Sequence, residues 1–222
     1  MLNWNTVESR LKAALIASMS AEEFRDFRLV GGTALSLHLG HRMSVDIDLF
    51  TDANYGSIDF NSIENYLIKK YPYVEGDLNS DPGMGKSYLI GQDRINNIKL
   101  DVFYSMDPFF QPMKVEDKIR LASVEEIIAM KLDIIQNGGR KKDFWDLHEL
   151  LQSYTIEEMI ALHALRFEWT HDPNLIRTQF TNFARAENER DPICLRGKEW
   201  GFIKQDFVEA LDRHRPGPGY TR

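Results

Sequence analysis

Residues 44–50 alternate between polar and apolar side chains up to Leu49, and this stretch constrains the fold more than any other part of the sequence. Every second residue from Val45 to Leu49 is apolar, which is typical of a strand that buries one face. Two aspartates, Asp46 and Asp48, share the other face. A solvated face is the commoner explanation of an Asp-x-Asp pair, but the depletion of aspartate in strands counts against it here.

A third acid has the same setting later in the chain. Residues 98–104 alternate in the same way, with Leu100 and Val102 on the apolar face and Asp101 on the other. Carboxylates two residues apart on a strand are roughly 7 Å apart, and a neighbouring strand would place a third beside them. We therefore expect a face that binds one or two divalent cations, since these prefer carboxylate oxygens.

A glycine pair, Gly31-Gly32, follows the apolar run 27–30 and precedes a helical pattern over residues 33–39. Glycine lets the backbone approach a ligand closely, and the amides of a helix N-terminus, with the Thr33 hydroxyl, suit a phosphate. By itself such a pair is more typical of a plain turn. Thirteen residues separate Gly32 from Asp46, which is room for one short helix and a return strand.

The remaining patterns alternate between helices and strands up to about residue 110 and are helical afterwards. Helices are expected over 7–15 and 58–68, an edge strand over 71–74, a hairpin over 87–104, and helices over 123–139, 142–152 and within 156–211. The motif Gly85-Lys86-Ser87 resembles the end of a phosphate-binding P-loop. We exclude a P-loop here, because the motif lies in an expected strand. The sequence predicts an α/β part over 1–110, a helical region over 111–212 and a mobile tail over 213–222.

Composition excludes several classes of protein. The 222 residues include 43% apolar residues, enough for a core, and carry a net charge of −7, which argues against broad binding of nucleic-acid backbones. A single cysteine, Cys194, rules out an internal disulfide and a cysteine-only metal cluster. Residues 1–20 mix charged with apolar side chains and no later apolar run is long enough to span a bilayer, so we expect a cytoplasmic protein without a membrane partner.

These motifs together resemble the nucleotidyltransferase superfamily related to DNA polymerase beta. Its signature is an apolar residue and two small residues, a gap of about 9 to 13 residues, an Asp-apolar-Asp motif and a later third acid. Val30-Gly31-Gly32, Asp46-Ile-Asp48 and Asp101 match these positions. Within the superfamily, the run from Gly31 to Phe50 is similar to the AbiEii/AbiGii group of bacterial toxins.

The resemblance implies a small mixed sheet flanked by helices, and two-metal transfer of a nucleotide from a nucleoside triphosphate. Asp46, Asp48 and Asp101 would then hold two Mg²⁺ ions. The other residues expected to hold the triphosphate are Gly31, Gly32, Thr33, Arg42, Ser44 and Lys131. Arg42 has a second interpretation, an ion pair with Asp46, and the sequence does not choose between the two.

Two later helices carry residues that resemble further family positions. Lys131 lies on the apolar stripe of its helix, so we expect its side chain to reach inward, where the resemblance implies that it binds a phosphate. The alternative is a lysine whose ammonium snorkels to the surface. Asp146 faces the core side of the next helix and needs a partner such as a lysine, a bound base or a metal-held water. Asp143 has an alternative role as an N-terminal cap. Arg140 stands near the place where relatives carry an arginine, and with Lys141 and Lys142 it forms a patch suited to an RNA end.

The resemblance also implies a toxin of a toxin–antitoxin pair of the abortive-infection kind, with an antitoxin partner and the 3′ end of tRNA as acceptor. Other readings stay open. Superfamily members also transfer nucleotides to small molecules or proteins, and a non-catalytic nucleotide-binding module would keep the fold alone. A Mg²⁺-dependent phosphohydrolase is a more distant alternative, because its acids would not need the glycine turn.

Overall fold

A computed structural model describes residues 1–212 of the chain. Its contacts divide the chain into two compact units, Met1–Ile127 and Ile128–Arg222. The first unit therefore extends past residue 110, where the sequence predicted the α/β part to end. The expected mobile tail, residues 213–222, lies outside the described residues.

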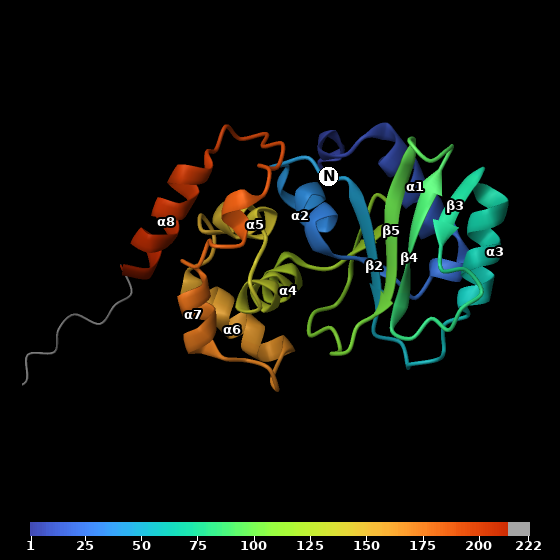
Figure 1. Ribbon diagram of the computed structural model, residues 1–222. Helices are drawn as coiled ribbons and strands as arrows, with labels where there is room; N and C mark the ends of the chain where they lie inside the picture. The colour runs from blue at the N-terminus through green and yellow to red at the C-terminus, as the bar shows by residue number, and fades with distance from the viewer. Residues whose placement is uncertain (213–222) are drawn as a thin grey trace, which may run out of the picture. The chain divides into compact units, whose positions relative to one another are not determined.

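The first unit is built on one mixed sheet (Figure 1). Its strands are β1 (Arg28–Leu29), β2 (Asp46–Thr51), β3 (Tyr73–Gly76), β4 (Gly85–Gly91), β5 (Asn97–Tyr104), β6 (Lys114–Glu116) and β7 (Ile119–Leu121). They lie in the order β3-β4-β5-β2-β1-β7-β6. β2 is parallel to β5 and β1 to β7, and the other neighbours are antiparallel. This confirms the α/β fold, the edge position of β3 and the β4–β5 hairpin.

The hairpin of β6 and β7 was not predicted and accounts for the later boundary of the first unit. β7 pairs with β1 through Leu121 and Leu29, so the hairpin completes the sheet. Its two-residue turn places Asp117 at φ 50° and Lys118 at φ 65°. Two left-handed residues match the twist of a hairpin, but the usual sequence signal for them is Asn-Gly or Asp-Gly.

Three helices accompany this sheet: α1 (Ser9–Ser20), α2 (Gly31–Leu39) and α3 (Phe60–Lys70). α1 and α3 lie side by side, since the Tyr66 hydroxyl donates to the carbonyl of Ala17 at 3.1 Å. The apolar faces of β2 and β5 are fully buried, as Ile47, Leu49 and Leu100 show. Burial of one face explains the alternating sequence and leaves the acids on the other.

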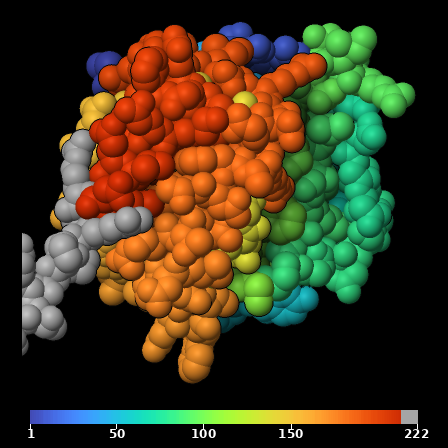
Figure 2. Space-filling model, turned by 60° about the vertical axis from the view of Figure 1, so that its left-hand side comes forward, coloured from blue at the N-terminus to red at the C-terminus, as the bar shows by residue number. Residues whose placement is uncertain are grey.

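The described residues of the second unit form helices joined by loops, and no strand is among them. α4 (Val124–Gln136) crosses the boundary between the units, and α5 (Lys141–Leu150), α6 (Ile156–Arg166), α7 (Pro173–Gln179) and α8 (Trp200–Asp212) follow. Phe207 of α8 packs against Phe144 and Phe180 with ring centroids 6.1 and 5.4 Å away. In Figure 2 the red atoms of α8 lie against the orange segment that contains α6 and α7. No helix within residues 1–212 has both the length and the apolar character that a membrane crossing requires.

Candidate active site

The pairing of β2 with β5 brings the three predicted acids together. The two strands are parallel, and their register sets Asp48 opposite Asp101 and Asp46 opposite Lys99. Neighbouring strands are about 4.8 Å apart, so facing side chains on one face are close neighbours. Asp46, Asp48 and Asp101 are each partly exposed, in contrast to the buried apolar residues between them. The first unit therefore presents one half-buried acidic face.

Lys99 belongs to the same face, and the sequence interpretation gave it no role. Its ammonium donates to Oδ2 of Asp101. Burial by itself lowers the pKa of Lys99, but the hydrogen bond to Asp101 and the charges of Asp101, Asp46 and Asp48 outweigh burial and raise it above its usual value. The strand pattern held this signal, because residues 99 and 101 point to one side.

The donor set on this face is the one that Mg²⁺ prefers, namely carboxylate oxygens. Oδ1 of Asp101 is buried and has no hydrogen-bond partner among the described residues, so one oxygen is available to a cation. As they stand, however, no three His, Cys, Asp or Glu side chains within residues 1–212 are grouped so that they could hold a metal ion. The residue types fit a divalent cation, while Lys99 already bonds the other oxygen of Asp101.

The glycine turn approaches these acids closely. Gly31 begins α2 at φ +67°, a conformation that favours glycine, and a Cβ there would lie 2.7 Å from Oδ2 of Asp48. A Cβ on Gly32 would collide with the guanidinium of Arg42. The Val30 amide donates to the carbonyl of Asp48 at 2.9 Å and fixes the turn against β2. The first amides of α2, which have no partner within the helix, therefore begin beside Asp48.

Three polar residues that the sequence placed on the triphosphate are buried against the protein. The hydroxyls of Thr33 and Ser44 are 2.7 Å apart, and Thr33 also donates to the carbonyl of Asp46. Arg42 is 3% exposed and donates to the carbonyl of Met43 at 3.0 Å. In this arrangement they hold the segment that leads into β2, and so fix where the acids begin.

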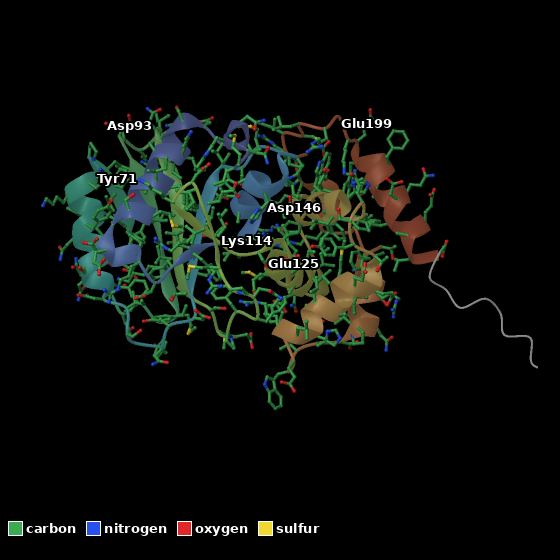
Figure 3. All side chains as sticks on the ribbon, turned by 180° about the vertical axis from the view of Figure 1, so that it is seen from behind. Tyr71, Asp93, Lys114, Glu125, Asp146 and Glu199 are labelled. Atoms are coloured by element: carbon green, nitrogen blue, oxygen red, sulfur yellow. The ribbon has the colours of Figure 1, made fainter. Side chains whose placement is uncertain are left out.

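The second unit contains a different cluster, formed by Lys131 of α4 with Asp143 and Asp146 of α5. The Lys131 ammonium lies 2.6 Å from Asp143 and 2.7 Å from Asp146, and all three side chains are at most 3% exposed. Asp146 projects from α5 in Figure 3. The expectation that Lys131 reaches inward and that Asp146 needs a partner is confirmed, and each satisfies the other.

Asp143 also caps α5, as the alternative interpretation expected. It accepts from the backbone amide of Arg140 at 3.2 Å and from Nε of Arg140 at 2.9 Å. Burial by itself raises the pKa of Asp143, but Lys131 and Arg140 outweigh burial and hold it below the ordinary value of 3.8. The carboxyl is therefore an anion fixed by two cations and a backbone amide.

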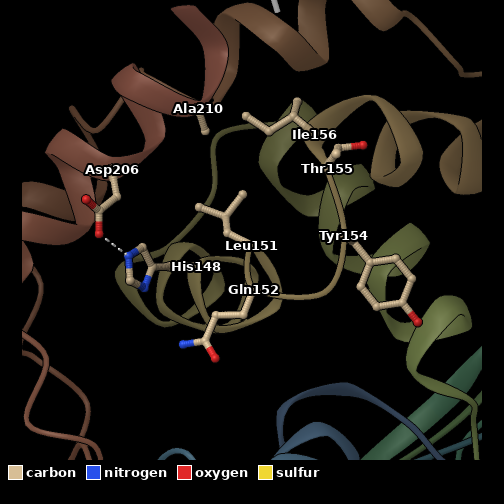
Figure 4. A pocket seen from close by; sticks show the side chains of 8 residues that line it. All are labelled: His148, Leu151, Gln152, Tyr154, Thr155, Ile156, Asp206 and Ala210. Atoms are coloured by element: carbon tan, nitrogen blue, oxygen red, sulfur yellow. Dashed lines mark hydrogen bonds and ion pairs between the residues drawn. The ribbon is translucent and has the colours of Figure 1, made fainter. Parts of the chain in front are cut away.

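The second unit also has a cavity of about 310 Å³ that the sequence did not indicate (Figure 4). His148 Nε2 lies 2.7 Å from Asp206 at its wall, and the Lys198 ammonium lies 2.8 Å from His148 Nδ1. Burial is the main cause that lowers the pKa of His148, with the nearby charge of Lys198 adding to it against Asp206. This ring is held between two charged neighbours, Asp206 and Lys198.

Structural relatives of the chain are nucleotidyltransferases at low sequence identity. A Helicobacter pylori protein described as a candidate nucleotidyltransferase superposes with a TM-score of 0.57 at 19% identity, over 93% of this chain and 94% of that one. MenT4, a nucleotidyltransferase toxin from Mycobacterium tuberculosis H37Rv, gives 0.56 at 14% identity, over 89% and 79%. These likenesses establish the fold.

Sequence comparison is more specific. An uncharacterized protein of Aquifex aeolicus (strain VF5) is 35% identical over 132 residues, or 58% of this chain and 59% of that protein. The chain thus spans about three fifths of that relative. The profile of the AbiEii nucleotidyl transferase toxins, from type IV toxin–antitoxin systems, matches residues 14–218, a range that contains the glycine turn, the three acids and the Lys131 cluster. The chain belongs to the AbiEii family of nucleotidyltransferase toxins.

Proposed function

We propose that this protein transfers a nucleoside monophosphate from a nucleoside triphosphate to an acceptor hydroxyl in a Mg²⁺-dependent reaction. The observation that carries the proposal is the register that sets Asp48 opposite Asp101 and Asp46 two residues away, beside the Gly31 turn. The acceptor oxygen bonds to the α-phosphorus, the bond from that phosphorus to the pyrophosphate oxygen breaks, pyrophosphate leaves and the hydroxyl proton is released to solvent.

Asp46 and Asp48 would hold both metal ions, and Asp101 the ion nearest the attacking hydroxyl. When bound, the ions would supply charge neutralisation and activation of that hydroxyl. The amides of Gly31, Gly32 and Thr33 at the start of α2 would bind the leaving phosphates, because a helix N-terminus attracts anions.

Because Lys131 and Asp146 resemble family positions, we propose that both also contribute to nucleotide transfer. The Lys131 ammonium already bonds two carboxylates, so any phosphate would compete with Asp143 and Asp146 for it. We expect Lys131 and Asp146 to contribute to transfer only while the buried ion pairs of Lys131 with Asp143 and Asp146 are intact.

The proposed acceptor is the 3′ end of tRNA, and the proposed protein partner is a cognate antitoxin in the cytoplasm. Membership of a family of toxins from type IV toxin–antitoxin systems supports the antitoxin partner. The tRNA acceptor rests on the sequence resemblance alone. The patch that suggested an RNA grip does not add support, because Arg140 is bonded to Asp143 and Lys141 is bonded to Asp191 at 3.0 Å.

The test incubates purified protein with each α-labelled nucleoside triphosphate, Mg²⁺ and total bacterial RNA, followed by electrophoresis. Asp46→Ala serves as the inactive variant. Label on RNA with the wild type alone supports transfer and its acceptor together, and omission of Mg²⁺ should abolish it.

Other outcomes select the alternatives. Label on protein or on a small molecule keeps the chemistry and discards tRNA. Triphosphate binding without transfer to any acceptor would contradict the proposal and favour a nucleotide-binding module, and release of phosphate alone would favour a hydrolase.

A further inference from the structure

The acidic face of the first unit includes a lysine, Lys99, whose ammonium bonds one of the carboxylates that would hold a metal ion. Lys99 lies opposite Asp46 in the strand register and bonds Asp101, which in turn lies opposite Asp48. The Lys99 ammonium therefore bonds one of the three carboxylates, and Lys99 lies opposite a second one in the strand register. The inference that follows rests on the proposed function, because it concerns the same acids.

Carboxylates placed opposite each other on neighbouring strands repel, and this destabilises the pair. A cation bonded to one of them offsets part of the repulsion. In the structure Lys99 provides that cation, through the Asp101 oxygen Oδ2, while Oδ1 of Asp101 stays buried and unpartnered. A divalent ion that took both oxygens of Asp101 would have to replace the ammonium at Oδ2.

A second lysine of the same sheet shows what a permanent ion pair looks like here. Lys86 of β4 bonds Glu64 at 2.6 Å, both side chains are at most 5% exposed, and Glu64 also accepts from Tyr88. The Lys99 side chain is 46% exposed. Lys86 is enclosed, whereas the flexible stem of Lys99 can swing into water. Its departure leaves the Asp101 side chain, which is 14% exposed, open to another cation.

We propose that Lys99 is an internal counter-ion of the acidic face. Its ammonium bonds Asp101 when no metal ion is bound, and a divalent cation displaces it. Lys99 is thus a positioning residue that acts through Asp101. It keeps the three acids together before the metal arrives and lowers their affinity for it.

The test measures binding of Mn²⁺ by the loss of the free-ion paramagnetic resonance signal, without nucleotide or RNA. The variants are Lys99→Met, Lys99→Arg and, as a control for net charge, Lys114→Met. Lys114 is an exposed residue of β6, four strands away from β5 in the sheet. Lys99→Met should bind Mn²⁺ at least about fivefold more tightly, the scale of one unit charge near contact in water. Lys99→Arg and Lys114→Met should bind like the wild type.

Thermal melting gives a second readout, first of stability without metal and then of its change on metal binding. In chelator, Lys99→Met should melt below the wild type, and Mn²⁺ should raise its melting temperature by more than it raises that of the wild type. Lys99→Gln replaces Lys99→Met if the latter does not fold. Unchanged or weaker Mn²⁺ binding in a folded, charge-removing variant overturns the inference.

The two proposals fail separately. Tighter Mn²⁺ binding in Lys99→Met with no nucleotide transfer by any variant would support the counter-ion and reject the proposed function. Transfer that depends on Asp46, together with Mn²⁺ binding unaltered by Lys99→Met, would reject the counter-ion alone.

Discussion

Each unit of the protein bonds a lysine to carboxylates, but the two clusters differ in their exposure to water. Lys131 lies between Asp143 and Asp146 with all three side chains at most 3% exposed. Lys99 bonds Asp101 with its own side chain 46% exposed. The same residue types therefore occupy a sealed environment in the second unit and an open one in the first.

This difference separates a structural cluster from an exchangeable one. Removing one member of a buried ion pair leaves a charge without compensation, which is costly, whereas a partly exposed pair contributes little to stability. An open cluster is able to exchange its cation, as a metal-dependent site must. The comparison is consistent with the proposed ion binding in the first unit and predicts that the Lys131 cluster contributes chiefly to folding stability.

The largest effect on stability is expected for Lys131→Met, which leaves Asp143 and Asp146 buried without their shared cation. We expect a loss of about 3–5 kcal/mol in the free energy of unfolding, measured by urea denaturation. Lys204→Met is the matched control, since Lys204 of the same unit pairs with the exposed Glu187 and should cost less than about 1 kcal/mol. Equal midpoints for the two variants would remove the distinction between the clusters.

Two glycine-to-alanine variants test how closely the turn at Gly31 approaches Asp48 in the first unit. Gly31→Ala and Gly56→Ala both place a side chain at positive φ, +67° and +80°, which costs about 1–2 kcal/mol. Only Gly31→Ala adds a contact with Asp48, because nothing lies within 4 Å of a Cβ on Gly56. We expect Gly31→Ala to be the less stable of the two in urea and to lose nucleotide transfer, while Gly56→Ala keeps transfer. Full activity in Gly31→Ala would argue against the close approach of turn and acid.

Acid should weaken the buried cluster in a defined direction. The folded pKa of Asp143 is depressed, so its contribution to stability is present above the ordinary value of 3.8 and is lost as pH falls below it through the folded pKa. Urea midpoints of the wild type and Asp143→Asn, measured from pH 6 downwards, should differ most at pH 6 and converge below pH 4. A difference that grows in acid would reverse the sign and contradict the assignment.

The smallest effect is expected for Asp101→Asn in chelator. The variant loses a partly exposed bond to Lys99 and also relieves repulsion against Asp48, so the free energy of unfolding should change by less than about 1 kcal/mol. Mn²⁺ binding should weaken in the same variant. A loss as large as that of Lys131→Met would show that the open cluster is structural as well.

Much of the fold follows from local patterns. The period-2 alternation of residues 44–50 and 98–104 predicted β2 and β5 because one face of each is buried. The inward course of Lys131 and the need of Asp146 for a partner followed from helical spacing and from the cost of burying a charge. These features depend on neighbours in sequence or on one helix face.

Other features depend on pairings that no local pattern specifies. The register of Asp48 against Asp101 joins strands 53 residues apart, and the hairpin turn at Asp117 and Lys118 has no glycine signal. Lys99 was overlooked although its position beside Asp101 follows from the same alternation. The burial of Arg42 and Thr33 is a tertiary property, and only the structure shows that they support β2.

The central claim is that the half-buried acidic face of the first unit performs the transfer, and one assay tests it most directly. Transfer of α-labelled nucleotide is measured for Asp46→Ala and for Asp77→Ala, an equivalent change at an exposed aspartate of the same unit, after both are shown to unfold like the wild type. We predict no transfer by Asp46→Ala and wild-type transfer by Asp77→Ala. Transfer retained by folded Asp46→Ala protein would contradict the claim.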